Sequence, residues 1–263
     1  MKMKNAGRPL FFKSLALARS NPGKIGLMML FDASFFVSFY YITPLLGKSF
    51  AQSLVVSNTS LIILMIAVFS LLYALLVVLI YSFFKYCLLD FIKSMFAKTE
   101  FSFKRLWNFY LLNVVIMLPS FVLFNFLLSS IKEAYRPYAL ILFGIPVSIL
   151  LYVIINTAHS LFYNGHSFKE SIRKSFAAAF ADITPYKETI LVILIAAILL
   201  FVVFFGIGYL VNFLASKNYY LYLRVYSYFA NISLLIQFLA FYFVILLNRI
   251  SFYAITLEKN FKK

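Results

Sequence analysis

The chain has 263 residues, of which 64% are hydrophobic and 12% are charged, and its formal net charge at pH 7 is +16. Soluble globular domains average about 45 to 50% apolar and about 25% charged residues, so an ordinary soluble domain is excluded. The sequence predicts an all-α integral membrane protein, because long apolar runs without the alternation of barrel strands satisfy their backbone polar groups only as helices.

Six apolar runs are each long enough to cross a hydrocarbon core about 30 Å thick, which requires roughly 20 helical residues. The runs cover residues 25–46, 60–83, 108–130, 138–160, 189–214 and 228–250. They occupy most of the chain and leave no room for a separate soluble domain. We therefore expect residues 1–263 to form one polytopic membrane domain.

Positive charge alternates between the segments that separate these runs. Of the 24 Lys and Arg residues, 19 lie before the first run, in the second and fourth connections, and in the C-terminal tail. Segments rich in Lys and Arg stay in the cytoplasm. The pattern predicts six transmembrane helices arranged as three hairpins in the cell membrane, with both termini cytoplasmic. The expected partner of these cations is a lipid bilayer with anionic headgroups, and not nucleic acid, because they lie close to the spans.

An amphipathic stretch that opens with a Phe-Lys pair precedes each odd-numbered span. The pairs are Phe12-Lys13, Phe103-Lys104 and Phe168-Lys169. After the third pair, an apolar stripe recurs every four residues, at Phe168, Ile172, Phe176 and Phe180, while charged residues take another face. Such a helix is expected to lie in the plane of the headgroups. A similar stripe at Phe84, Leu88, Phe91 and Met95 predicts a surface helix after the second span.

These elbows suggest three units, covering residues 1–84, 85–160 and 161–263. Each unit would consist of a cytoplasmic elbow helix followed by a helical hairpin. Internal duplication explains the pattern, and so does a biophysical constraint shared by every hairpin. A match of three amino-acid types does not separate these explanations in a chain with 33 Phe residues.

The elbows also carry a resemblance to a known group of proteins. The segments from Phe12-Lys13 to Asn21-Pro22, and from Ser167-Phe168-Lys169 to Arg173-Lys174, resemble the prokaryotic membrane domain associated with glycerophosphodiester phosphodiesterases. The resemblance covers nearly the whole chain and implies its architecture. The catalytic domain of those proteins has no counterpart here, so no functional residue is transferred.

Polar side chains inside spans are candidates for function, because a charged one costs about 2.5 to 3.5 kcal/mol on insertion scales. Asp32 lies about 10 Å into the first span at a rise of 1.5 Å per residue. Residues at similar depth on other spans are Asn113, Asn156, His159, Asn248 and Arg249. Together they would form a polar pocket open to the cytoplasm. Alternatively, they are hydrogen-bonding groups that hold helices together, or they do not meet in the folded protein.

Two prolines interrupt the middle spans. Pro119 and Pro146 each fall near mid-membrane, where a proline kinks a helix and frees backbone carbonyls. The freed carbonyls would line a cavity, as broken helices do in transporters, or the kinks serve packing alone.

Signatures of intramembrane enzymes are absent from the sequence. The two histidines, His159 and His166, are seven residues apart with no acid between them, which does not fit a zinc protease helix. Asp32 is the clear intramembrane acid, whereas aspartyl proteolysis needs two. The single cysteine, Cys87, cannot form an internal disulfide. We expect no catalytic activity, no metal and no cofactor.

Two functional hypotheses follow. The first is a non-catalytic scaffold or partner subunit that binds a membrane protein, or another copy of itself, through its basic cytoplasmic rim and tyrosine-rich outer edge. The alternative is a small transporter or permease with a pocket near Asp32. A water-accessible cavity reaching Asp32, Asn113 and His159 would favour transport, whereas closed packing with paired side chains would favour the scaffold.

Overall fold

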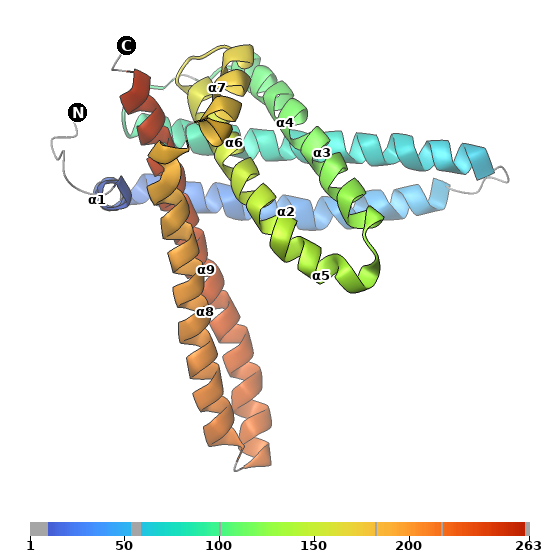
Figure 1. Cartoon of the computed structure of the whole chain (residues 1–263), viewed down its shortest axis with the longest axis vertical. Coiled ribbons are helices and arrows are strands. Elements are labelled where there is room, and N and C mark those ends of the chain that lie inside the picture. Colours follow the sequence, from blue (N-terminus) through green and yellow to red (C-terminus); the bar gives the residue numbers. More distant parts are fainter. Residues whose placement is uncertain (1–9, 54–58, 100, 182, 217, 261–263) are drawn as a thin grey trace. The chain divides into compact units, whose positions relative to one another are not determined.

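Every regular element in the described part of the chain is a helix (Figure 1). The computed structural model describes residues 10–53, 59–99, 101–181, 183–216 and 218–260. Some basic residues of the predicted charge pattern lie outside these ranges, namely Lys2, Lys4, Arg8, Lys217, Lys262 and Lys263. Within them the protein is all-α, as the sequence predicts.

The helices follow one another with short connections. They are α1 (Leu10–Ser20), α2 (Pro22–Ser53), α3 (Thr59–Ser94), α4 (Phe103–Ser130), η1 (Glu133–Tyr135), α5 (Arg136–Ala139), η2 (Leu140–Gly144), α6 (Ile145–Tyr163), α7 (Phe168–Phe180), η3 (Thr184–Tyr186), α8 (Lys187–Ala215) and α9 (Tyr219–Asn260).

Six segments of the described chain are long and apolar enough to cross a membrane. They are Pro22–Ile42, Ser60–Ser94, Phe103–Phe124, Glu133–Tyr163, Thr184–Leu214 and Leu223–Leu257. Each overlaps one predicted run, although the ends differ by several residues. By length and composition, the chain is therefore a multi-pass membrane protein.

The surface helix predicted after the second span is not a separate element. Instead, α3 continues without a break through 36 residues to Ser94, a length of about 54 Å at 1.5 Å per residue. No proline or glycine interrupts the sequence here. The apolar stripe of this segment is expected to face lipid, but part of it packs within the protein. Leu88 is fully buried, and the Phe91 ring lies 5.4 Å from the Phe31 ring on α2.

The two prolines of the middle spans have different local effects. Pro119 lies inside the unbroken helix α4. Pro146 occupies the first turn of α6, directly after the π-helical turn η2. A proline lacks the N–H that would bond four residues back, and a π-helical turn is one way to accommodate the displaced carbonyl. The fourth span is thus built from four successive helical pieces, η1, α5, η2 and α6.

Contacts group the helices into two compact units. One contains α2 to α7, and the other contains α1, η3, α8 and α9. In the first unit, α2 packs against α3, α3 against α4, and α6 against α7. In the second unit, α8 and α9 lie side by side (Figure 1). These limits cut across the three predicted units, and whether the hairpins are repeats stays a prediction.

Helix α1 belongs to the second unit through two hydrogen bonds. The Phe11 amide donates to Glu188 Oε1 at 3.0 Å, and the Ser14 and Ser251 hydroxyls are 2.8 Å apart. Ser14 and Ala18 are buried, whereas Phe12 is 57% exposed. The first elbow helix therefore packs through its small residues and exposes a phenylalanine.

Candidate functional site

Three polar side chains from α3, α4 and α6 form a buried chain of hydrogen bonds. Asn113 Nδ2 donates to Ser82 Oγ at 2.9 Å, and Ser82 Oγ donates to the Val78 carbonyl at 2.6 Å. Asn113 Oδ1 lies 2.5 Å from His159 Nε2. Because an amide oxygen only accepts, His159 Nε2 carries the proton in this arrangement. We call Ser82, Asn113 and His159 the polar chain.

The polar chain is closed by its surroundings. Ser82 and Asn113 are fully buried, and His159 is 1% exposed. The His159 ring packs 4.8 Å from the Phe109 ring and 6.3 Å from the Tyr81 ring, measured between centroids. The chain therefore connects three spans through buried hydrogen bonds in an aromatic environment.

The side-chain hydrogen bonds of Asn113 go to Ser82 and His159. Asn156 donates to the Tyr152 carbonyl one turn back on its own helix, at 2.8 Å. Asp32 is half-buried on α2. Asn156 and His159 are three residues apart on α6, yet their hydrogen bonds go to different helices.

Asn248 and Arg249 lie on α9 in the second unit. Asn248 is fully buried, and its Nδ2 donates to the Thr189 carbonyl of α8 at 2.7 Å. Arg249 is half-buried. Nearby, the Tyr186 and Phe252 rings stack with centroids 5.1 Å apart. Asn248 thus connects the two long helices of its own unit.

A second cluster, which the sequence analysis missed, surrounds the C-terminal end of α6. Lys93 Nζ donates to the Tyr163 carbonyl at 3.3 Å. Arg105 Nη2 donates to the Phe162 and Tyr163 carbonyls at 3.3 and 3.4 Å. Both cations also lie over the Tyr163 ring, at 5.5 and 5.6 Å from its centroid. We call Lys93 and Arg105 the cation pair.

The Asp90 carboxylate takes part in this cluster by accepting hydrogen bonds from two hydroxyl groups. Its Oδ1 accepts from the Tyr163 hydroxyl at 2.9 Å, and its Oδ2 accepts from Thr99 Oγ1 at 3.2 Å. Among the residues that the structure describes, neither member of the cation pair forms an ion pair with a carboxylate. The positive charge is therefore stabilised by carbonyl dipoles at a helix C-terminus and by an aromatic face.

Helix α6 ends in a turn that fixes the start of α7. The His166 amide donates to the Leu161 carbonyl and the Gly165 amide to the Phe162 carbonyl, which is the Schellman pattern of helix ends. Gly165 has a φ of +98°, a region that side chains disfavour. A sequence signal was present, since Asn164-Gly165 follows the last apolar residues of the span.

Helix α7 begins with a capping interaction and an ion-pair network. Ser167 Oγ accepts from the Glu170 amide, a hydrogen bond that caps the N-terminus of α7. The Glu170 carboxylate contacts Lys174 Nζ at 2.8 Å and His166 Nδ1 at 3.1 Å. Hydrogen bonds from Lys174 and His166 lower the pKa of the Glu170 carboxyl to about 2.

The buried face of α7 is made of small residues, and its aromatic residues point outward. Ser171, Ser175, Ala178 and Ala179 are buried, on a helix that packs against α6 and α4. Phe176 and Phe180 are 42% and 68% exposed, and their rings stack with centroids 6.3 Å apart. This repeats the arrangement of α1.

Within the described ranges, no three His, Cys, Asp or Glu side chains come together as metal ligands. Comparisons with protein-family models, with curated proteins and with solved structures give no match to this chain. The resemblance to the membrane domain associated with glycerophosphodiester phosphodiesterases therefore stays a prediction.

Proposed function

We propose that this chain is a non-catalytic multi-pass protein of the cytoplasmic membrane that serves as a scaffold or partner subunit. The observation that carries the proposal is the closed polar chain. Asn113 and His159, two of the candidate pocket residues, are buried and bonded to each other. Their direct hydrogen bond and their burial between helices support a structural role for both side chains.

The proposed topology has both termini and the second and fourth connections in the cytoplasm, with the spans arranged as three hairpins. Exposure on α7 supports an in-plane position for that helix. Its stacked Phe176 and Phe180 face away from α6, and Lys169 and Arg173 are exposed beside them. Aromatic rings next to cations suit the boundary between acyl chains and headgroups.

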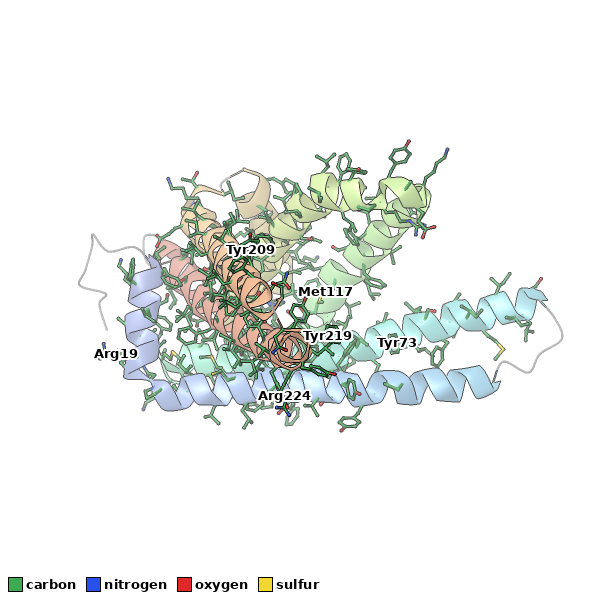
Figure 2. All side chains as sticks on the ribbon, turned by 90° about the horizontal axis from the view of Figure 1, so that it is seen from below. Arg19, Tyr73, Met117, Tyr209, Tyr219 and Arg224 are labelled. Atoms are coloured by element: carbon green, nitrogen blue, oxygen red, sulfur yellow. The ribbon has the colours of Figure 1, made fainter. Side chains whose placement is uncertain are left out.

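The proposed partner surface is the second unit. Within the Thr184–Leu214 segment, an 18-residue window has a mean hydropathy of 3.4 and contains no buried residue. Figure 2 shows Tyr219 and Arg224 near the start of α9. Tyr219 and Tyr220 are 70% and 84% exposed. Tyrosine and arginine are enriched in protein interfaces, which supports a protein partner at this edge.

Photo-crosslinking in cells tests this proposal. A photoreactive amino acid placed at Tyr219 or Tyr220 should yield a discrete protein adduct, identified by mass spectrometry as another membrane protein or a second copy of this chain. The matched control position is Phe143, which is 67% exposed in the first unit. Adducts of equal yield at Phe143, or lipid adducts alone at all three positions, would contradict a partner surface here.

The transport alternative has its own test. Under the scaffold proposal, Asp32→Asn leaves solute fluxes of the cell unchanged and affects only the abundance of the folded protein. Loss of uptake or export at unchanged abundance would instead identify a transporter. Abundance is measured by immunoblotting of the membrane fraction, and fluxes are measured with a panel of labelled solutes.

A further inference from the structure

The cation pair brings two positive charges unusually close together. Lys93 Nζ and Arg105 Nη2 both donate to the Tyr163 carbonyl oxygen, at 3.3 and 3.4 Å. Two atoms this near one oxygen are at most about 7 Å apart, a separation that one phosphate group can bridge by accepting from both cations. Like charges at this distance repel each other, so an anion between them is favourable.

The hydrogen bonds that these cations already make leave some of their N–H donors available to an anion. Distances of 3.3 to 3.4 Å exceed the usual range of about 2.7 to 3.2 Å for N–H···O bonds. Lysine has three N–H donors and arginine has five, whereas the bonds described involve only Nζ of Lys93 and Nη2 of Arg105. Both side chains are half-buried, so solvent still reaches them.

Among the described residues, Asp90 forms no direct ion pair with Lys93 or Arg105, although its negative charge attracts Lys93. The Tyr163 hydroxyl and Thr99 bind its two carboxylate oxygens. The Tyr163 ring carries the hydroxyl that holds Asp90, while the cations lie over its face. Lys24 adds another cation nearby, since its Nζ donates to the carbonyl of Ser94, the residue after Lys93, at 2.7 Å.

The surroundings of Arg105 indicate the depth of a membrane interface. Phe101, Phe103 and Trp107 are 47%, 78% and 57% exposed, and they flank Arg105 in sequence at the start of α4. Exposed aromatic side chains at the end of a span are typical of the headgroup level. The apolar surfaces of α3 and α4 continue along the spans from these aromatic residues and can contact acyl chains.

We propose that Lys93 and Arg105 together bind the phosphate of an anionic phospholipid headgroup. The Lys93 ammonium contributes a point charge and the Arg105 guanidinium a planar donor group, while the exposed aromatic residues contact the upper part of the acyl chains. This inference goes beyond the proposed function, because it requires residence in the membrane but no protein partner. If the crosslinking test finds no protein partner, the phospholipid site is unaffected. If the lipid test fails, the proposed partner surface is likewise unaffected.

The test measures lipid binding to the purified, delipidated full-length chain by native mass spectrometry. Phosphatidylglycerol, which is anionic, is compared with phosphatidylcholine that carries the same acyl chains. In phosphatidylcholine the positive charge of choline balances the negative charge of the phosphate. We expect at least a tenfold preference for phosphatidylglycerol. Removing each charge should weaken binding about fivefold, so Lys93→Gln with Arg105→Gln should abolish the preference.

The matched control removes two exposed charges from the same segment, by Lys98→Gln with Lys104→Gln. This control variant should retain the preference. Equal loss in both double variants would show diffuse surface attraction and overturn the site. Inorganic phosphate is added in a separate arm at the lipid concentration. Displacement of the lipid by phosphate at that concentration would show a site for free phosphate and overturn the assignment to lipid.

A measurement on the unmodified chain covers the case in which the double variant does not fold. Phosphatidylglycerol with a photoreactive group near its headgroup should crosslink to peptides that contain Lys93 or Arg105. Crosslinks confined to α7 or α9 would overturn the proposal. Arg105→Lys, which keeps the charge but loses the planar donor group, should retain most of the crosslinking.

Discussion

Replacement of Asn113 by leucine should be among the most destabilising single changes in the first unit. The side chain donates to Ser82 and accepts from His159, so the substitution removes two hydrogen bonds between helices. Such bonds average about 0.6 kcal/mol and reach about 1.7 kcal/mol in membrane proteins. Leaving the buried His159 N–H without an acceptor adds about 1 to 3 kcal/mol. These contributions add up to a total loss of about 2 to 6 kcal/mol.

The structure also predicts how a second substitution changes this loss. His159→Phe alone leaves the Asn113 carbonyl oxygen buried without its donor. In Asn113→Leu with His159→Phe, both polar partners are replaced by apolar groups of similar shape, and this is nearly neutral when both change together. The double variant should therefore be more stable than additivity predicts, by about 1 to 2 kcal/mol.

Unfolding in mixed micelles of increasing sodium dodecyl sulphate content, followed by circular dichroism, measures these free energies. Asn212→Leu is the control, because Asn212 is exposed on α8 and its replacement should cost little. Strictly additive single and double variants would refute a direct interaction between Asn113 and His159. A cost for Asn113→Leu no greater than that for Asn212→Leu would refute the role of the polar chain in stability.

Three further predictions concern the turn before α7, the charge network within it, and the topology. Gly165→Ala should destabilise the protein by about 1 to 2 kcal/mol in the same unfolding assay, because the φ of +98° disfavours a side chain. Gly206→Ala, at a helical position with open space around the added carbon, should not destabilise it. The pKa of Glu170, about 2, lies below its usual value of 4.5, so the carboxylate stabilises α7 above pH 4.5 and loses this effect as pH falls towards 2. Glu170→Gln should accordingly speed amide exchange in α7 at pH 6 but not near pH 2; equal effects at both values would contradict the network. With the native cysteine replaced, Lys98→Cys should react with a membrane-impermeant thiol reagent only after permeabilisation and Glu133→Cys in intact cells, and the reverse pattern would invert the topology.

The helices themselves follow from the sequence. Inside a bilayer, each backbone polar group must find a partner within its own segment or barrel, so long apolar runs become helices whatever their neighbours are. The six predicted runs therefore overlap the six membrane-long helices. The recurrence of Phe168, Ile172, Phe176 and Phe180 likewise predicted the helix that the structure contains as α7.

Which face of a helix contacts protein could not be derived from hydropathy. Lipid tails are as apolar as phenylalanine, so burial of the aromatic stripe of α7 against other helices offers no advantage. Close packing and hydrogen bonding favour small residues instead. Accordingly, Ser171 and Ser175 lie in the interface, while Phe176 and Phe180 remain exposed. The same reasoning explains why Ser14 holds α1 against Ser251.

The sequence by itself determined that the chain is helical and multi-pass, because composition and run length decide whether a segment is stable in lipid. Only the tertiary structure decided which polar groups meet. His159 bonds to Asn113, although Asn156 is its neighbour on the same helix, and Lys93 approaches Arg105 at the end of α6. These pairings depend on the rotation and axial register of each helix. Both are set by side-chain packing between segments distant in sequence, which no local periodicity records.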